Sequence, residues 1–324
     1  MSLHSIFADL SSRLKQQVIG QDALIDGLLT GLLADGHLLL EGPPGVAKTR
    51  AVRILAGLID ADFHRIQFTP DLLPADLTGT EIFRPQDGGF RFERGPIFHS
   101  ILLADEINRA PAKVQSALLE AMGERQVTIG PASHPLPPLF MVLATQNPIE
   151  HEGTYPLPEA QLDRFLMKLA IGYPAQEAER EILALARREA RAGTVADAVP
   201  PAPTFISQTE VFAARREVLD LHLAPQLEGY IVALAAATRQ PEQLDPALAG
   251  KVHFGASPRG TIALERAARA HAWLAGRDYV SPADIQAMVP ATFGHRVLLG
   301  YEAEARGETV ADLLHVILRR VAVP

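Results

Sequence analysis

One stretch of this sequence has the residue types and spacing that bind phosphate. Glycines and prolines bend the backbone so that successive N–H groups converge on an anion, and a following helix directs its positive end to the same point. Lys48 is placed to meet the β- and γ-phosphates of a nucleotide, and Thr49 to hold Mg²⁺. The predicted loop comprises Gly42, Pro43, Pro44, Gly45, Val46, Ala47, Lys48 and Thr49.

The loop departs from the usual pattern at one position. Where a P-loop has glycine directly before the lysine, this chain has Ala47. Alanine fits there if its φ is negative, because only glycine adopts a positive φ without steric cost. The motif therefore predicts a negative φ at Ala47.

Two adjacent carboxylates follow a short apolar run at residues 101–104, which predicts a buried strand. Open α/β sheets place ligands at the carboxyl ends of such strands. Asp105 can hold Mg²⁺ together with Thr49, through water, while Glu106 can orient or deprotonate an attacking water. The pair therefore predicts hydrolysis of the bound nucleotide rather than binding alone.

Three further residues are candidates for phosphate contacts. Asn147 follows the apolar run 140–145 and can hydrogen-bond a γ-phosphate and the attacking water, although asparagine before proline is also a common turn residue. Arg164 can reach the γ-phosphate of a neighbouring subunit, or it can pair with Asp163. Arg259 opens a predicted helix, where a cation opposes the helix dipole by roughly 0.3–1 kcal/mol. A phosphate or a partner carboxylate would explain its position.

A turn at residues 18–21 is a candidate wall for the adenine ring. Gly20 would let the backbone approach a flat ligand closely, and Ile19 would contact it, although an ordinary turn between helices fits as well. Arg50, directly after the loop, completes the predicted nucleotide contacts.

Composition narrows the class of protein. The 324 residues suffice for two domains, and 48% hydrophobic with 21% charged residues is typical of a folded globular chain. A net charge of −8 disfavours nucleic acid as a general partner. The absence of cysteine excludes disulfides and thiolate metal sites and fits a reducing compartment. The N-terminus lacks a continuous signal-like apolar segment, and the most apolar window, 23–40, is interrupted by charges, so we expect a cytoplasmic protein without a membrane span.

Periodicity predicts an α/β first half. Apolar spacing predicts helices at 3–16, 22–34 and 48–59 and from Pro111 onward, and strands at 37–41, 63–68, 101–104, 140–145 and 165–171. Two hairpins are predicted at 82–97, with an Asp87-Gly88-Gly89 turn, and at 125–138. Phe83, Phe90 and Phe92 alternate with arginines in the first hairpin, which would suit single-stranded nucleic acid, a peptide, or packing onto its own domain.

The second half is predicted to be helical. Helices are expected at 176–191, 207–222, 226–238, 258–275, 281–288 and 308–321, with a proline-rich linker at 198–203. We place the domain boundary between 173 and 174, giving a nucleotide-binding core at 1–173 and a helical lid at 174–324.

The order of these motifs resembles the AAA+ ATPases. The loop, residues 103–111, residues 144–148 and residues 157–165 resemble the MoxR family in particular, and the resemblance covers essentially the whole chain. It implies an αβα core with a five-stranded parallel sheet, followed by an all-α lid. It also implies a Walker A motif at 42–49, a Walker B motif at 101–106, sensor 1 at Asn147, an arginine finger at Arg164 and sensor 2 at Arg259, through which the lid would close.

The resemblance further implies function and partners. Members of the family are thought to be hexameric ATPases that bind ATP or ADP with Mg²⁺ and remodel or mature client proteins, often with a partner that carries a von Willebrand factor A domain. Three alternatives remain at this point. They are a nucleic-acid motor, the ATPase subunit of a metal chelatase, and a regulatory switch that binds ATP and assembles without mechanical work.

Overall fold

The computed structural model describes residues 2–86, 88–147, 154–191 and 204–324. Asp87 of the expected hairpin turn and the expected linker at 198–203 lie outside these residues. Among the described residues, no helix is long and apolar enough to cross a membrane.

A parallel sheet of five strands forms the centre of the first half, as predicted. The strands lie in the order β2-β5-β8-β1-β9, so β1 and the phosphate loop that follows it lie between two neighbours. Parallel strands place all their carboxyl ends at one edge, which therefore gathers the ends of β1, β5 and β8. The bounds are β1 Leu38–Glu41, β2 Phe63–Gln67, β5 Ile101–Asp105, β8 Met141–Gln146 and β9 Met167–Ala170.

Strand residues alternate between two apolar cores because successive side chains point to opposite faces of a sheet. In β5, Ile101 and Leu103 join one core, whereas Leu102 and Ala104 join the other. The first core also takes in α1 (Leu3–Gln17), α2 (Asp22–Leu33) and α3 (Lys48–Leu58). The second contains α5 (Ala112–Glu124) and the short α4 (Pro74–Thr78). Burial on both faces explains why these strands read as continuous apolar runs.

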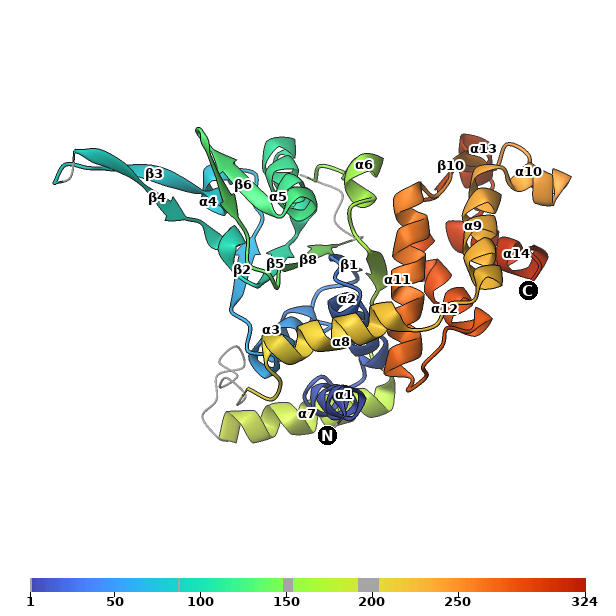
Figure 1. Cartoon of the computed structure of the whole chain (residues 1–324), viewed down its shortest axis with the longest axis horizontal. Helices are drawn as coiled ribbons and strands as arrows, with labels where there is room; N and C mark the ends of the chain where they lie inside the picture. The colour runs from blue at the N-terminus through green and yellow to red at the C-terminus, as the bar shows by residue number, and fades with distance from the viewer. Residues whose placement is uncertain (1, 87, 148–153, 192–203) are drawn as a thin grey trace.

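Both predicted hairpins are present. The first consists of β3 (Gly79–Arg84) and β4 (Gly89–Arg94), and the second of β6 (Gln126–Ile129) and β7 (Ala132–Pro135). Figure 1 shows β3 and β4 extending far from the body of the molecule. At its base, Phe92 stacks on His134 of the second hairpin with ring centroids 4.2 Å apart. Phe83 and Phe90 remain 52% and 71% exposed, so self-packing accounts for the base of the hairpin and not for its outer part.

The second half is helical, with one small addition. A two-stranded antiparallel pair, β10 (Val252–Phe254) and β11 (Leu298–Leu299), accompanies the helices. The helices are α7 Gln176–Arg191, α8 Gln208–Asp220, α9 Pro225–Arg239, α10 Pro241–Leu244, α11 Pro258–Leu274, α12 Pro282–Phe293, α13 Tyr301–Ala305 and α14 Val310–Arg320. The remaining short elements are the 3₁₀ turns Pro96–Phe98, Ile107–Arg109 and Pro246–Leu248 and the helix α6 Glu159–Leu162.

The helical half packs onto the sheet half. In Figure 1, α8 runs from α3 towards α11, and it packs against α1, α2 and α11. Arg215 of α8 donates from Nε to the carbonyl of Leu32 at 2.8 Å, and the N–H groups of Phe205 and Ile206 both donate to the carbonyl of Leu58. The first apolar core accordingly extends from Phe7 to Val321.

Candidate active site

The phosphate loop follows β1 and leads directly into α3, whose first residue is Lys48. Gly45 has φ +82°, and a Cβ built on it would meet no atom within 4 Å, so the loop leaves open space on this side. The Lys48 ammonium donates to the carbonyl of Gly42 at 2.7 Å. An exposed, glycine-lined turn with a lysine folded over it at a helix N-terminus is suited to bind polyphosphate.

Ala47 contradicts the expectation of a negative φ. It lies in the left-handed region, with φ 61° and ψ 21°, and it is the cap residue of α3. This conformation costs an alanine about 1–2 kcal/mol. The loop thus keeps the backbone shape that glycine would adopt, at the expense of local strain.

Two acidic side chains near the phosphate loop influence the pKa of Lys48. Burial lowers the pKa of the Lys48 ammonium, while the nearby carboxylates of Asp105 and Glu106 act to raise it. Lys48 and the two carboxylates, predicted from two separate motifs, therefore lie within electrostatic reach of one another. A bound phosphate would add further negative charge beside the lysine and favour its charged form.

Asp105 ends β5 and makes two sets of contacts that the sequence did not indicate. Its Oδ1 accepts a hydrogen bond from the Thr145 hydroxyl at 2.5 Å. Its Oδ2 accepts from Arg65, at 3.0 Å from Nε and 2.6 Å from Nη2. Arg65 lies on the neighbouring strand β2, two residues before its end, so it can reach across to β5. Asp105 is thereby held in place from both neighbouring strands.

Glu106 lies one residue beyond the strand, with φ 56° and ψ 51°. A left-handed backbone is unusual for glutamate and is found where neighbouring contacts hold it. Those contacts are the Thr145 hydroxyl, which accepts from the Glu106 N–H at 2.9 Å, and Gln67, whose amide donates to Oε2 at 2.7 Å. Arg109 also pairs with Oε2 at 3.0 Å. The carboxylate that is predicted to handle water is therefore held by two donors.

Asn147 directly follows β8 and lies at the same sheet edge. The neighbouring Gln146 carbonyl accepts from the Gly42 N–H at 3.4 Å, which places the end of β8 against the phosphate loop. The structure thus brings Lys48, Thr49, Asp105, Glu106 and Asn147 to one edge of the sheet.

The residues here fit a magnesium ion. The Thr49 hydroxyl and the Asp105 carboxylate are oxygen donors, and Mg²⁺ prefers oxygen ligands while keeping several waters. Among the described residues, no group of three or more His, Cys, Asp or Glu side chains could hold a metal. Such a sparse protein contribution is typical of sites where Mg²⁺ arrives with nucleotide phosphates.

An apolar cavity of about 220 Å³ adjoins the loop. Ile19 and Arg50, which are predicted to contact the nucleotide, line this cavity, and so do Val46 and Ala47. Gly20, with φ +73°, does not line it, because its backbone packs against Pro174 and Ala178, which a Cβ would approach within 2.9 Å. The far wall comes from α7 and consists of Ile182, Leu185, Ala186 and Glu189.

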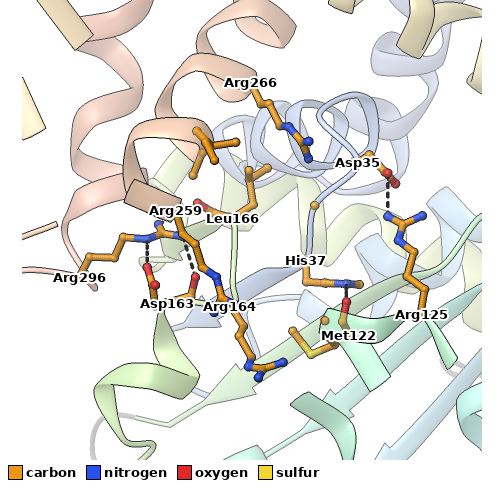
Figure 2. Close-up of a pocket in the computed structure, with 14 residues that line it drawn as sticks. Asp35, His37, Met122, Arg125, Asp163, Arg164, Leu166, Arg259, Arg266 and Arg296 are labelled. Carbon is orange, nitrogen blue, oxygen red and sulfur yellow. Dashed lines mark hydrogen bonds and ion pairs between the residues drawn. The ribbon is translucent and has the colours of Figure 1, made fainter. Parts of the chain in front are cut away.

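Arg164 and Arg259 lie elsewhere. Arg164 precedes β9 and therefore belongs to the amino-terminal edge of the sheet, opposite the phosphate loop. Figure 2 shows it beside Arg259 in a pocket of about 300 Å³ that also contains Arg125, Arg266 and Arg296. The structure thus joins the two predicted arginines to each other and not to the loop of their own chain.

Carboxylates neutralise only part of this pocket. Asp163 pairs with Arg296, and Asp35 pairs with Arg125 at 2.6 Å. Arg164 donates to the carbonyl of Leu119 at 2.7 Å. Within the described residues, neither Arg259 nor Arg266 forms an ion pair with a carboxylate. The pocket is therefore suited to an anion supplied from outside the chain.

Comparison with known proteins gives a consistent result along the whole chain. The model of the ATPase family associated with various cellular activities (AAA) matches residues 37–167, and an AAA lid domain model matches residues 247–317. Chaperone MoxR1 of Mycobacterium tuberculosis is 47% identical over 311 residues, which cover 96% of this chain and 80% of that protein. Protein MoxR of Methylorubrum extorquens is 33% identical over 329 residues, covering 98% and 95% of the two chains. A crystal structure from Cytophaga hutchinsonii matches with a TM-score of 0.90 and 44% identity, covering 99% of this chain and 96% of that one.

Proposed function

The chain belongs to the MoxR family of AAA ATPases, and from this membership we propose that it hydrolyses ATP between copies of itself to remodel a client protein. One observation carries the proposal. Lys48, Asp105 and Glu106 lie at the carboxyl edge of the sheet, whereas Arg164 and Arg259 lie at the opposite edge. A site that needs both sets must therefore combine two chains.

Binding of ATP is assigned to the loop and the adjoining cavity. The loop N–H groups and the Lys48 ammonium bind the phosphates, and the apolar cavity beside Ile19 and Val46 takes the base. Thr49 and Asp105 would hold Mg²⁺, which neutralises charge on the phosphate oxygens when it is bound. Arg65 must then give up part of its pairing with Asp105.

We assign to Glu106 the role of accepting a proton from the attacking water or orienting that water. Its carboxylate accepts a proton from the attacking water, or orients that water, while Asn147 hydrogen-bonds the water and the γ-phosphate. The present donors to Oε2, Gln67 and Arg109, would have to release the carboxylate for this step. The left-handed backbone of Glu106 and the Thr145 hydroxyl fix the base of the side chain throughout.

Arg164 and Arg259 are assigned to the ATP of the neighbouring subunit. Two guanidinium groups at the γ-phosphate would stabilise the charge that builds up in the transition state, an effect that reaches about 10³–10⁵ in rate for arginine fingers. Arg259 would then act between subunits, and not by closing the lid over its own loop. A closed ring, which we propose to be a hexamer, gives every copy both neighbours.

We assign the work performed on the client protein to the two hairpins. Phe92 and His134 join the two hairpins by ring stacking, so a shift of one would be transmitted to the other. The similarity to a chaperone supports remodelling of proteins as the work performed. We further propose a cytoplasmic setting and a partner with a von Willebrand factor A domain, on the strength of family membership.

A mixing experiment tests the shared site. Glu106→Gln should bind ATP normally and hydrolyse it very slowly, and Arg164→Ala should abolish turnover by itself. In a mixture, interfaces that join the intact loop of an Arg164→Ala chain to the intact arginine of a Glu106→Gln chain should recover part of the activity. If the mixture is as inactive as its components, the arginine does not act between subunits.

A nucleic-acid motor is the second candidate, supported by the outer part of the first hairpin. Phe83 and Phe90 are exposed there, next to Arg84 and Arg91, and aromatic rings with cations suit stacking of single strands. The net charge of −8 works against this function. Salt-dependent binding of single-stranded DNA that Phe90→Ala removes would favour the motor over the protein remodeller.

A further inference from the structure

The helix α7 is held to the nucleotide site by few contacts. None of its described residues is buried, although it is 16 residues long and carries several apolar side chains. Its start is fixed where Ala178 packs on Gly20, and the rest of its inner face lines the cavity assigned to the base. A helix with so little burial has a low local stability.

One ion pair holds the other end of α7. Arg50 donates to both carboxylate oxygens of Glu189, at 2.6 Å from Nη2 and 3.2 Å from Nη1. Arg50 Nε also donates to the carbonyl of Gln17 at 2.9 Å. A single guanidinium therefore connects α7, the end of α1 and the first turn of α3. Bidentate pairs of this kind fix geometry as well as adding energy.

The position of Glu189 does not stabilise α7 through the helix dipole. It lies in the last turn of the helix, where a negative charge opposes the helix dipole. Both side chains of the pair are about one quarter exposed, so water screens their attraction only partly. The position is explained by the contact with Arg50, two residues after Lys48.

The cavity supplies the link to the nucleotide. Ile182, Leu185 and Ala186 face it from α7, while Ile19 and Val46 face it from the body. A planar base in this space would bury apolar surface on both walls at once. Because a ligand that contacts both walls favours the arrangement in which they are close, base binding and docking of α7 stabilise each other.

We propose that Glu189 is a positioning residue that latches α7 over the base and so sets how long a nucleotide stays bound. The proposal rests on nucleotide binding at the loop as assigned above. Loss of the latch frees the wall of the cavity and opens a path for the base to leave. Release of ADP is the step most affected, since it follows loss of the γ-phosphate contacts.

Dissociation kinetics test the latch. A fluorescent ADP analogue is bound to the assembled full chain and then chased with excess ADP. The dissociation rate is compared for the parent, Glu189→Ala and Glu181→Ala. Glu181 lies exposed on the same helix and has no ion pair among the described contacts, so it serves as the matched control. We expect about tenfold faster dissociation for Glu189→Ala and the parental rate for Glu181→Ala. Equal rates in all three proteins would overturn the proposal.

A second readout follows α7 itself. The chain contains no cysteine, so Leu183→Cys, at a site 57% exposed on α7, can carry a single spin label. ADP should immobilise the label in the parent and much less in Glu189→Ala, while the unfolding midpoint without nucleotide stays similar. A label that is equally immobile with and without ADP in both proteins would contradict a movable wall.

Lys48→Ala distinguishes failure of nucleotide binding from failure of the latch. If Lys48→Ala binds the analogue as tightly as the parent, nucleotide binding at the loop is wrong and the latch has no ligand to retain. If Lys48→Ala loses the analogue but Glu189→Ala releases it at the parental rate, the loop assignment stands and the latch alone is wrong.

Discussion

Asp163 pairs with Arg296, 133 positions further along the chain, and not with its neighbour Arg164. The Arg296 Nε donates to Asp163 Oδ1 at 2.8 Å, and the Ser257 hydroxyl donates to the same carboxylate. Arg296 is almost fully buried and also donates to the carbonyls of Leu166 and Phe165. The pair occupies the carboxylate next to Arg164 in the sequence, and the Arg164 guanidinium donates instead to the carbonyl of Leu119.

Because Asp163 holds Arg296 and not Arg164, substitutions at these two adjacent residues should have opposite effects on stability and on turnover. Asp163→Asn leaves a buried guanidinium uncompensated, and we expect the free energy of unfolding to fall by about 3–5 kcal/mol. Arg164→Ala removes one hydrogen bond to a carbonyl and should cost only about 1 kcal/mol while abolishing turnover. Urea denaturation followed by circular dichroism, alongside ATPase rates, measures both. Similar stability losses in the two variants would contradict a structural role for Asp163 that Arg164 does not share.

Thr145 is expected to support catalysis without touching ATP. Thr145→Val keeps the shape of the side chain but removes the hydroxyl that bridges the Asp105 carboxylate and the Glu106 N–H. Residues that orient metal-binding groups in this way typically contribute 10–100-fold, so we expect kcat to fall by about that factor. Thr145→Ser retains the hydroxyl and should stay within about threefold of the parent. Steady-state ATPase rates decide, and equal rates for the two variants would remove the bridge from the mechanism.

Ala47→Gly should stabilise the protein. The substitution relieves a left-handed alanine, worth about 1–2 kcal/mol, and loses about 0.5–1 kcal/mol to the greater freedom of glycine in the unfolded chain. We expect a net gain of up to about 1.5 kcal/mol in the free energy of unfolding. Ala184→Gly, in the exposed part of α7, is the control and should lose about 0.5–1 kcal/mol. A loss of stability at position 47 would show that the loop does not strain its alanine.

Stability should fall as the pH is lowered from 6.5 towards 4. Burial, together with the charge of Arg125, lowers the pKa of His37 from 6.5 to about 4, and burial next to Arg296 lowers that of His295 to about 3. In this window the unfolded chain binds protons that the folded chain does not, so acid favours unfolding. For His37 alone the loss is on the order of 3 kcal/mol.

The hydrogen bonding of His37 supports a loss of stability as the pH falls. Its Nδ1 accepts from the Val142 N–H at 2.9 Å, so the ring cannot take a second proton without losing that bond. Denaturation at a series of pH values should give a flatter profile for His37→Gln than for the parent, whereas His315→Gln, at an exposed position, should follow the parent. Parallel profiles for the parent and His37→Gln would contradict the assignment.

The sequence was sufficient for the fold class and for the residues at strand ends. Apolar runs identified β1, β5 and β8, and parallel pairing then forces the residues after them to one edge. Partners that depend on register were not predictable. Arg65 reaches Asp105, and Gln67 reaches Glu106, only because β2 pairs with β5 so that Gln67 lies opposite Asp105.

Two other features were beyond local patterns. The φ of Ala47 follows from the closure of the loop and not from the preference of alanine. The location of Arg259 depends on how α11 packs against α2 and α12, which periodicity does not determine. Motif order predicts a phosphate contact at Arg259, but only the three-dimensional arrangement separates this residue from its own loop.

The continuous apolar core has a consequence for folding cooperativity. Side chains from α1 to α14 share it, so the interior of the helical half is continuous with one side of the sheet half. Heating should therefore produce one transition in which calorimetric and van't Hoff enthalpies agree. A chain cut before α8 would expose the apolar surface that α8 covers on α1 and α2, and would be prone to aggregate rather than to form a free-standing ATPase core.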